Sequence, residues 1–358
     1  MSAIPQKIKE AINRCLAHGI AFAAYRLPDA KVRFIASLNN SSGTDRDDSF
    51  VITPWDRRYG ESTCIAADYD EISLMEATSG KEPKGDNTFT FMPSTDKAEY
   101  TANLTQLIDL LQKRGGKTVI SRIMSGECDS IDWAEAADRL FDRYPDAFCH
   151  IYYHPRTGAW LGATPEVLVS SDRRENSFLT MALAGTKKKG EAWDDKNRSE
   201  QQMVTDFIVG NLNELGAKVT ASQVSDLQYG DIAHLCTYIN IKCTGGENVS
   251  HQTICNILSP TPAVAGLPRG KALAEIALFE RHQRLCYGGY LTVENTDNTG
   301  RISYVNLRCA HFSGNRFTIY AGGGITAQSV PETEWAETEA KAKTLKDIIN
   351  NLGNARSK

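Results

Sequence analysis

The sequence predicts an α+β fold in which all 358 residues form one large domain. Strand-like segments lie far apart along the chain with helical segments between them, and they lack the regular strand–helix alternation of a parallel sheet. The chain contains no internal repeat and no low-complexity linker that would divide it. Its hydrophobic content of 41% is enough to fill a sizeable core. We therefore expect a single unit over residues 1–358.

Apolar residues at helical spacing predict the helices. The segment 97–114 illustrates the pattern, because its leucines and isoleucines recur on one face and Gly115-Gly116 follows its end. In chain order, the predicted helices are residues 6–18, 97–114, 133–143, 194–215, 251–258, 271–283 and a last helix that begins after Ser329 and ends near Asn350.

Short runs of β-branched, aromatic or alternating residues predict the strands. In chain order, these are residues 20–25, 31–37, 117–122, 148–154, 159–163, 167–169, 178–183, 233–243, 287–294, 301–312 and 316–320. Leu27-Pro28-Asp29 predicts a hairpin between the first two strands, and the turn residues 155–158 predict another between 148–154 and 159–163. The polar segments 39–48 and 80–87 predict mobile loops.

Charge and composition exclude several classes of protein. With 44 acidic against 40 basic residues, the chain has no basic excess for binding nucleic acid or an anionic membrane. The apolar stretch within residues 1–27 is too short and too interrupted for a signal peptide or a spanning helix, so we expect a cytoplasmic protein. The nine cysteines are scattered without a CxxC pair, which indicates neither a disulfide framework nor a structural zinc site.

The segment 321–341 concentrates groups that bind ions. The strand 316–320 is expected to stop at Gly322, Gly323 and Gly324, whose bare N–H groups could hold an anion. Ser329 and Glu332 have the spacing of a capping box, with Pro331 in the first turn of the helix that follows.

On that last helix, Glu334, Glu337 and Lys341 fall at positions i, i+3 and i+7 and therefore share a face. Two carboxylates in a row can hold a hard divalent cation, and a neighbouring ammonium can hold a negative group that the cation also attracts. The alternative is a solvated helix face with ordinary i,i+4 ion pairs.

Four further segments complete a recognisable set. They are KTVISR at 117–122, GATPE at 162–166, ALAGT at 182–186 followed by the helix that carries Glu200, and SPTPAVAG at 259–266. Together with ETEWAETEAK at 332–341, they resemble the chorismate-utilising enzymes, most closely the isochorismate synthases. The resemblance covers about residues 117–345, so we expect motifs of a catalytic core at 96–350 and a more variable part at 1–95.

The resemblance implies two large antiparallel sheets packed together with helices outside. It also implies a Mg²⁺-dependent, reversible reaction in which water adds at C2 of chorismate and the C4 hydroxyl leaves. Such a reaction needs a base and an acid on opposite faces of the ring. The simpler interpretations of the two residues that match this base and this acid are a lysine at a strand end in solvent and an exposed carboxylate in a turn.

The resemblance assigns roles residue by residue. Lys117 matches the base and Glu166 the acid, while Glu200 and Glu337 match the metal ligands, with Glu334 acting directly or through water. The groups that hold the substrate's carboxylates are matched by Arg308, on an expected strand 304–309, by Lys341 and by the N–H groups of Gly322, Gly323 and Gly324. Gly185 matches the position whose backbone meets the C4 hydroxyl. Gly185 could instead simply mark a β-bulge.

The chain departs from the family pattern at several places, among them the segment between Glu166 and Glu200, which looks shortened. Ser259 stands where a histidine usually begins an HPTPA motif, Gln201 stands where a histidine is common, and Glu280-Arg281 replaces a usual Phe-Asp-Arg stretch. None of these removes the base, the acid or the metal ligands.

Related activities stay open as alternatives. Salicylate synthases keep the lysine and go on to eliminate pyruvate. Aminodeoxychorismate synthases often carry a PIKGT-like motif where this chain has ALAGT, and anthranilate synthases lack a lysine at the position of Lys117, so both differences favour water as the nucleophile. A non-catalytic chorismate-binding protein would have lost at least one of Lys117, Glu166, Glu200 or Glu337, and all are present. We expect chorismate as the partner, a monomer or weak homo-oligomer, and menaquinone before siderophore biosynthesis as the pathway.

Overall fold

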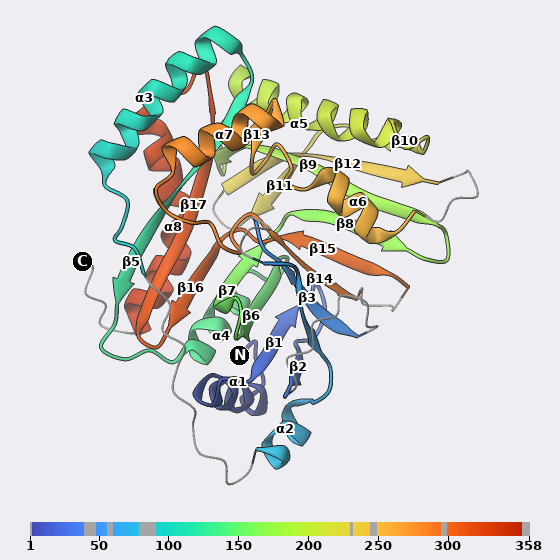
Figure 1. The fold of residues 1–358 in the computed structure, drawn as a ribbon, viewed down its shortest axis with the longest axis vertical. Coiled ribbons are helices and arrows are strands. Elements are labelled where there is room, and N and C mark those ends of the chain that lie inside the picture. Colours follow the sequence, from blue (N-terminus) through green and yellow to red (C-terminus); the bar gives the residue numbers. More distant parts are fainter. Residues whose placement is uncertain are drawn as a thin grey trace.

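Two antiparallel β-sheets pack face to face in the computed structural model, and helices cover their outer faces (Figure 1). The structure describes residues 2–38, 48–55, 60–78, 91–229, 232–243, 249–294 and 299–352. The loops predicted at 39–48 and 80–87 lie outside the described residues, except for Asp48.

The first sheet, which we call sheet A, contains the two long strands that carry much of the site. In spatial order its strands are β13 (Gly266–Leu267), β5 (Lys117–Glu127), β17 (Arg316–Thr326), β16 (Cys309–Ser313), β7 (Gly158–Thr164), β6 (Phe148–His154), β1 (Ala21–Arg26) and β2 (Arg33–Ser37).

The second sheet, sheet B, faces sheet A. In spatial order its strands are β10 (Lys218–Ala221), β12 (Ile232–Lys242), β9 (Ser177–Lys188), β8 (Val167–Asp172), β15 (Arg301–Val305), β14 (Tyr290–Glu294), β3 (Ser49–Thr53) and β4 (Thr63–Ala66), with β11 (Ser225–Tyr229) paired to β12.

Helices bury the outer faces of both sheets. They are α1 (Gln6–His18), α2 (Glu71–Ala77), α3 (Lys97–Arg114), α4 (Trp133–Arg143), α5 (Asp195–Asn213), α6 (His251–Leu258), α7 (Arg269–Phe279) and α8 (Pro331–Leu352). The helices α1, α4 and α8 share an apolar core with sheet A, α5 and α6 share one with sheet B, and α3 and α7 pack over the ends of β5 and β17. The predicted α+β fold of two packed sheets is confirmed.

Alternation along the strands explains why both faces of sheet A are apolar. In β6, Phe148 and Tyr152 point toward sheet B, whereas Cys149, Ile151 and Tyr153 point toward the helices. Because helices cover one face and a sheet covers the other, the strand is buried throughout.

Several predicted boundaries are wrong where strands continue through residues without an apolar pattern. The strand β5 runs to Glu127, β9 runs to Lys188, and β17 continues through its three glycines to Thr326. The cause is pairing: β17 bonds to β5 along the whole length of Lys117–Glu127, and a backbone ladder does not depend on side-chain pattern.

Two further corrections concern local backbone geometry. The expected strand 301–312 is broken between Val305 and Cys309, where Arg308 has a left-handed φ of 49°, so Arg308 lies in a connection and not on a strand. The predicted capping box is also wrong, because the Ser329 hydroxyl accepts a hydrogen bond from the N–H of Thr326 and α8 begins later, at Pro331.

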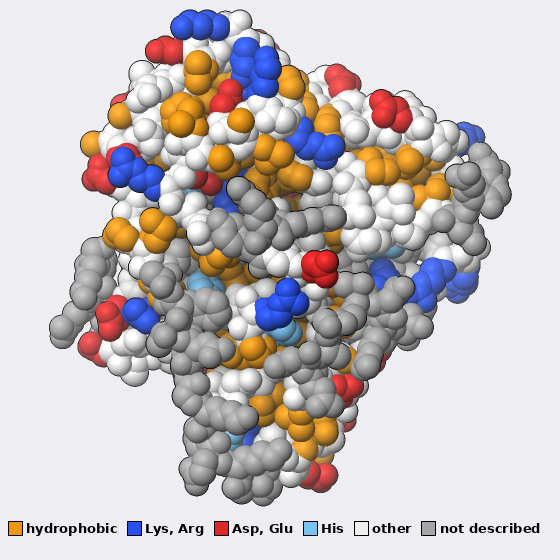
Figure 2. Space-filling model, viewed as in Figure 1, with side chains coloured by type: hydrophobic (Ala, Val, Ile, Leu, Met, Phe, Trp, Pro, Cys, Tyr) orange, Lys and Arg blue, Asp and Glu red, His pale blue; other side chains and the backbone are white. Residues whose placement is uncertain are grey.

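No helix within the described ranges is both long and apolar enough to cross a bilayer. On the face shown in Figure 2, acidic and basic side chains are interspersed, as expected from a net charge of −4.

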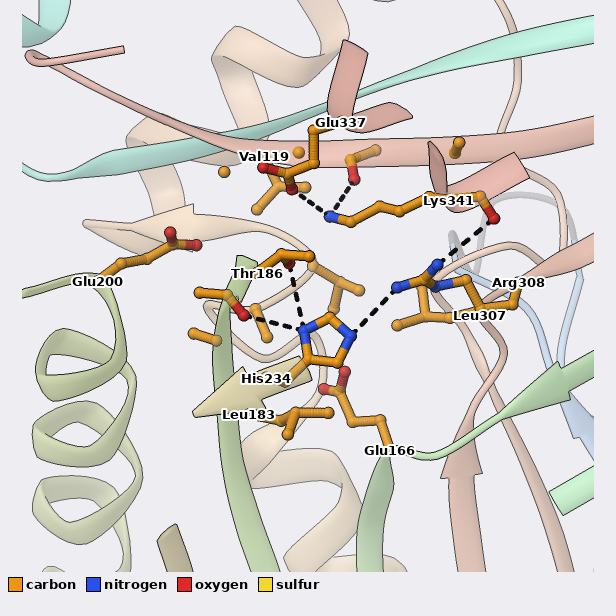
Figure 3. Close-up of a pocket in the computed structure, with 18 of the residues that line it drawn as sticks. Val119, Glu166, Leu183, Thr186, Glu200, His234, Leu307, Arg308, Glu337 and Lys341 are labelled. Atoms are coloured by element: carbon orange, nitrogen blue, oxygen red, sulfur yellow. Dashed lines mark hydrogen bonds and ion pairs between the residues drawn. The ribbon is translucent and has the colours of Figure 1, made fainter. Parts of the chain in front are cut away.

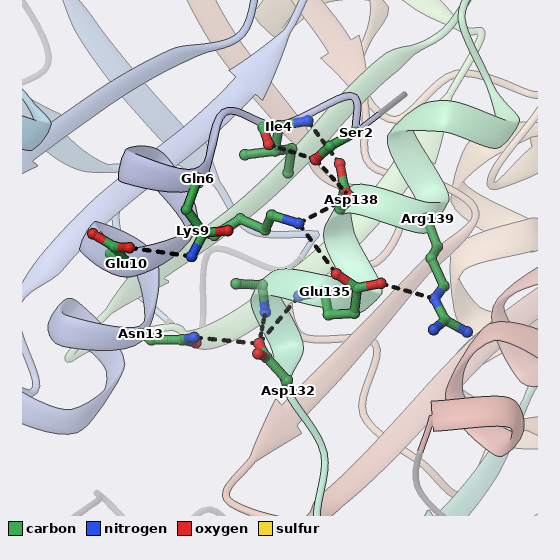
Figure 4. A network of polar contacts seen from close by, with 11 residues as sticks. Ser2, Ile4, Gln6, Lys9, Glu10, Asn13, Asp132, Glu135, Asp138 and Arg139 are labelled. Atoms are coloured by element: carbon green, nitrogen blue, oxygen red, sulfur yellow. Dashed lines mark hydrogen bonds and ion pairs between the residues drawn. The ribbon is translucent and has the colours of Figure 1, made fainter.

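A buried carboxylate joins the beginning of the chain to α4 (Figure 4). Asp138 accepts hydrogen bonds from the Ser2 hydroxyl at 2.8 Å, the Ile4 N–H at 2.7 Å and the Lys9 ammonium at 3.1 Å. Burial alone would raise the pKa of Asp138, but these donors outweigh it and lower the pKa below its ordinary value. The carboxylate therefore stabilises the docking of α1 only while it is ionised.

We expect Asp138→Ala to lower the free energy of unfolding by roughly 2 kcal/mol or more at pH 7, because it leaves a buried N–H and an ammonium without their acceptor. Since the folded pKa is lowered, this contribution is present above about pH 4 and is lost as the pH falls through the folded value. Urea unfolding from pH 7 to pH 3 measures the difference, with the exposed Asp142→Ala on the same helix as control. A difference that did not shrink at low pH would contradict this role.

Candidate active site

A cavity between the ends of the two sheets collects nearly all of the sequence-predicted site residues (Figure 3). Its lining residues surround about 700 Å³ of empty space, open solvent included. The predicted residues that line it are Lys117, Glu166, Gly185, Glu200, Arg308, Gly322, Gly323, Gly324, Glu337 and Lys341; among them only Glu334 is missing from the lining.

Lys117 opens β5 and is buried. Its side chain is 1% exposed, which excludes a lysine in solvent, and its Nζ donates to Glu200 Oε1 at 2.6 Å. Side chains alternate along β5, so Lys117 and Val119 face the cavity whereas Arg122 faces α8. The sheet thus directs the lysine inward.

The three glycines of β17 make room on both faces of the strand. A Cβ at Gly324 would overlap the carboxylate of Glu200, and one at Gly322 would lie 2.8 Å from the Tyr287 hydroxyl. On the opposite face, a Cβ at Gly323 would lie 3.3 Å from Glu334 Oε2. Side chains at these positions would displace groups that the site brings together.

The Gly322 carbonyl faces the cavity edge, since it accepts from Lys341 Nζ at 2.9 Å. The N–H of a residue in an extended strand points to the same side as its carbonyl, so the Gly322 N–H also faces that edge. A hydrogen-bond donor for an anion is therefore available there, although the strand does not end at the glycines as the sequence pattern predicted.

Glu166 lies in the break between β7 and β8 and is almost fully buried. Burial raises the pKa of Glu166 to about 7, and Lys117, Lys341 and Arg308 offset only part of that effect. With this pKa, a large fraction of the molecules carries the proton on Glu166 near neutral pH, and that proton can be donated.

His234 on β12 is a cavity residue that sequence analysis missed. Its Nδ1 lies 2.9 Å from the Gly185 carbonyl, an acceptor only, so Nδ1 carries the proton. Its Nε2 is then the acceptor for Arg308 Nη2 at 3.2 Å (Figure 3). Burial, then Arg308 and Lys341, lower the pKa of His234 to about 3, which keeps the ring neutral.

Gly185 has a left-handed φ of 74° at a register shift between β9 and β12. It is therefore a bulge residue and also a cavity residue, with its carbonyl turned toward His234. The only sequence signal for His234 was its place in the strand predicted to start at Ala233.

Arg308 is held from several sides. Besides His234, its guanidinium lies over the Tyr229 ring at 5.3 Å and donates to the Lys341 carbonyl at 3.4 Å. Fixed in this way, Arg308 and Lys341 present two cations to one end of the cavity, as recognition of carboxylates requires.

Each of the three predicted metal ligands pairs with a lysine. Glu200 pairs with Lys117 at 2.6 Å and Glu337 pairs with Lys341 at 2.6 Å. Glu334 lies outside the cavity lining, is 1% exposed, and pairs with Lys196 at 2.5 Å. Sequence analysis did not single out Lys196.

The two carboxylates of α8 differ in their electrostatics. Burial and then the neighbouring Glu337 raise the pKa of Glu334, an effect that Lys196 partly offsets. For Glu337, burial acts in the same direction and is the largest single effect, but Lys341 and Lys196 contribute to an opposite effect that outweighs it, so the pKa is lowered.

The donor set suits a hard divalent cation. Carboxylate oxygens are its preferred ligands, and Glu334 Oε2 is a buried oxygen without a hydrogen-bond partner, beside the repelling charge of Glu337. No three His, Cys, Asp or Glu side chains converge into a ready metal cluster within the described part of the chain.

The departures from the family pattern have structural roles. Gln201 donates to Thr237 at 2.7 Å and so ties α5 to β12. Glu280 pairs with buried Arg284 at 2.6 Å, and Arg284 donates to the carbonyl of Val119. Ser259 caps the C-terminus of α6. Gln201, Glu280 and Ser259 are not among the described residues that line the cavity.

Two anchors hold the helices that carry the carboxylates. Asn197 near the start of α5 accepts from the Thr186 N–H at 3.0 Å, which places Glu200 one turn later. Buried Arg122 stacks on Trp335 at 3.6 Å and donates to Thr338 at 2.6 Å, which holds α8 against β5.

Comparisons with known proteins show the family to which the chain belongs. The family described as "Chorismate binding enzyme" matches residues 57–350. Isochorismate synthase MenF of Escherichia coli (strain K12) is 32% identical in an alignment of 278 residues that covers 68% of this chain and 59% of that protein. The chain thus spans about three fifths of the length of that relative.

Two other matches bear on reaction and fold. Anthranilate synthase component 1 of Thermococcus kodakarensis is 25% identical over 336 residues, covering 85% of this chain and 73% of that protein. The solved structure of MenF, the menaquinone-specific isochorismate synthase from Escherichia coli, superposes with a TM-score of 0.76 at 21% identity, covering 97% of this chain and 92% of that one. This likeness shows a shared fold.

We expect Glu166→Gln to change the pH dependence of stability. Because the folded pKa of Glu166 is raised to about 7, burial of the protonated carboxyl stabilises fully below about pH 4.5 and is lost as the pH rises through 7. The variant should therefore gain up to about 3 kcal/mol over the wild type at pH 8.5 and little at pH 4.5. Chemical unfolding at both pH values measures this.

The exposed Glu214→Gln serves as the control, since it should show no such difference. Parallel pH profiles for Glu166→Gln and the wild type would show that Glu166 ionises normally in the folded protein.

Proposed function

The chain belongs to the family of chorismate binding enzymes, and on that premise we propose that it is an isochorismate synthase. One observation carries the proposal: Lys117 and Glu166 enter the same cavity, and burial raises the pKa of Glu166 to about 7, so that a large fraction of the molecules carries this proton near neutral pH. The reaction needs a base and an acid in one cavity.

The proposed reaction balances with these two groups. In the reactive form Lys117 is a neutral amine. Water forms a bond to C2 and gives its proton to that amine, the ring double bonds shift, and the C4–oxygen bond breaks as Glu166 protonates the departing hydroxyl. The reverse reaction exchanges the two roles. Loss of the hydroxyl as water avoids expelling hydroxide, which is why a protonated Glu166 matters.

The cations around the cavity support a dianionic substrate. Arg308 and Lys341, together with the Gly322 N–H, lie where they can hold a carboxylate, and His234 holds the guanidinium in place. We propose chorismate as that substrate, consistent with the family and with the isochorismate synthase relative.

We propose Mg²⁺ as the cofactor, with Glu200 and Glu337 as ligands and Glu334 acting directly or through water. When bound, Mg²⁺ would neutralise the ring carboxylate of the substrate as a hard Lewis acid. The unpartnered Oε2 of Glu334 and the oxygen-only donor set support this choice.

We further propose that the enzyme acts in the cytoplasm and that its product feeds menaquinone biosynthesis before a siderophore pathway. The similarity to MenF supports the first pathway. Salicylate synthesis and anthranilate synthesis are the alternative activities, and the similarity to an anthranilate synthase supports the second alternative.

Incubation of the purified protein with chorismate and Mg²⁺, followed by mass spectrometry of the products, tests the proposal. Isochorismate alone is expected, with and without ammonia. Salicylate with pyruvate, or anthranilate when ammonia is added, would replace the assignment with the corresponding alternative.

Lys117→Ala and Glu166→Gln should each lower kcat on the order of a hundredfold or more, because each removes a proton-transfer group. Steady-state kinetics measures the loss, and the exposed Lys113→Ala should retain wild-type kcat. Wild-type kcat in either site variant, with folding confirmed by circular dichroism, would contradict its role.

Glu337→Gln should raise the Mg²⁺ concentration needed for half-maximal activity by about tenfold or more, because an amide oxygen is a weaker ligand than a carboxylate. Activity titrated with Mg²⁺ measures the shift, with the exposed Glu332→Gln on the same helix as control. Equal Mg²⁺ requirements in all three proteins would argue against Glu337 as a ligand.

A further inference from the structure

Lys196 is a charged residue near the site that neither the catalytic nor the substrate-binding assignments use. It lies in the first turn of α5, one turn before Glu200, and its side chain is 22% exposed. Its Nζ lies 2.5 Å from Glu334 Oε1. The contact joins residues 138 positions apart, on two different helices.

The position of Lys196 is fixed by the start of its helix. Asp194 caps α5 by accepting from the Asn197 N–H at 2.8 Å, and Asn197 in turn accepts from Thr186 on β9. The first turn of α5 is therefore held against sheet B, and the lysine side chain reaches toward α8.

The ammonium of Lys196 pairs with Glu334, and the charges of Glu200 and Glu337 also act on it. Glu334 attracts the ammonium most strongly, and Glu200 and Glu337 add to this electrostatic attraction. An isolated buried carboxylate such as Glu334 is costly, so a nearby cation stabilises the folded protein. Lys196 supplies that cation within the chain.

We infer that Lys196 is a built-in counter-cation: it neutralises Glu334 in the metal-free protein and must leave Glu334 when a divalent cation binds. The inference rests on the metal site of the proposed function. Glu334 Oε1 accepts from Lys196 and Oε2 lies free beside Glu337, so a divalent ion there would lie close to the ammonium. A divalent cation and an ammonium close to the same carboxylate repel each other strongly in a buried site.

This competition has two consequences of opposite sign. Lys196 stabilises the folded protein without metal, since it pairs with a buried carboxylate. It also weakens metal binding, because binding must first break that pair. A lysine that only held α5 to α8 would contribute the first effect without the second.

Mg²⁺ binding by isothermal titration calorimetry at pH 8, without substrate, tests the inference in wild type, Lys196→Gln and the control Lys189→Gln. Lys189 is exposed and precedes the same helix. Lys196→Gln should bind Mg²⁺ about tenfold more tightly than wild type, a typical size for such coupling, and should melt at a lower temperature in EDTA. Lys189→Gln should match wild type in both.

Unchanged or weaker Mg²⁺ affinity in folded Lys196→Gln would overturn the inference and leave the proposed function standing. If no variant, wild type included, binds Mg²⁺, both the inference and the metal assignment fail.

Wild-type protein provides a second test that does not depend on the folding of a variant. Acetylation of lysines by acetic anhydride, followed by peptide mass spectrometry, reports how accessible each ammonium is. Labelling of Lys196 should be slow in EDTA and several-fold faster with saturating Mg²⁺, whereas Lys189 should label equally in both. Equal protection of Lys196 with and without Mg²⁺ would overturn the inference.

Discussion

The antiparallel pairing of β5 with β17 is the constraint on which the site depends. It sets Lys117 beside the glycine run of the neighbouring strand, and the absence of side chains there lets carboxylates approach from both faces. Glu200 of α5 lies against the inner face of β17, and Glu334 of α8 lies against its outer face. A ladder of backbone bonds thus brings two helices, attached to different sheets, to one place.

The carboxyl groups of the site differ in how their charge is compensated. Glu337 and Glu200 each have a lysine at 2.6 Å, and Glu334 has one at 2.5 Å. Glu166 differs, because burial outweighs the cations around it and raises its pKa to about 7, which leaves it partly protonated near neutral pH. Carboxyl groups in one site whose environments push their pKa values apart can serve opposite tasks, proton donor and anionic ligand.

Some elements follow from local sequence and others do not. The predicted bounds of α1, α3, α4 and α6 agree with the structure residue for residue, because apolar spacing and end signals lie within each segment. Local sequence did not predict that β17 continues through its glycines or that the chain breaks at Arg308, since strand pairing and the left-handed turn depend on distant partners. His234 was missed for the same reason, because its partners Gly185 and Arg308 lie in other elements.

The sequence by itself determined the fold class, the motifs that identify the family, and the placement of Glu334, Glu337 and Lys341 on one helix face. These depend on residue type and on spacings of a few positions, which helix geometry converts directly into position. Only the tertiary structure decided which carboxyl keeps its proton, which lysine pairs with which glutamate, and that Lys196 belongs to the site. Burial and ion pairing arise from packing between segments far apart in the chain, such as the 138 positions between Lys196 and Glu334, and no local pattern encodes them.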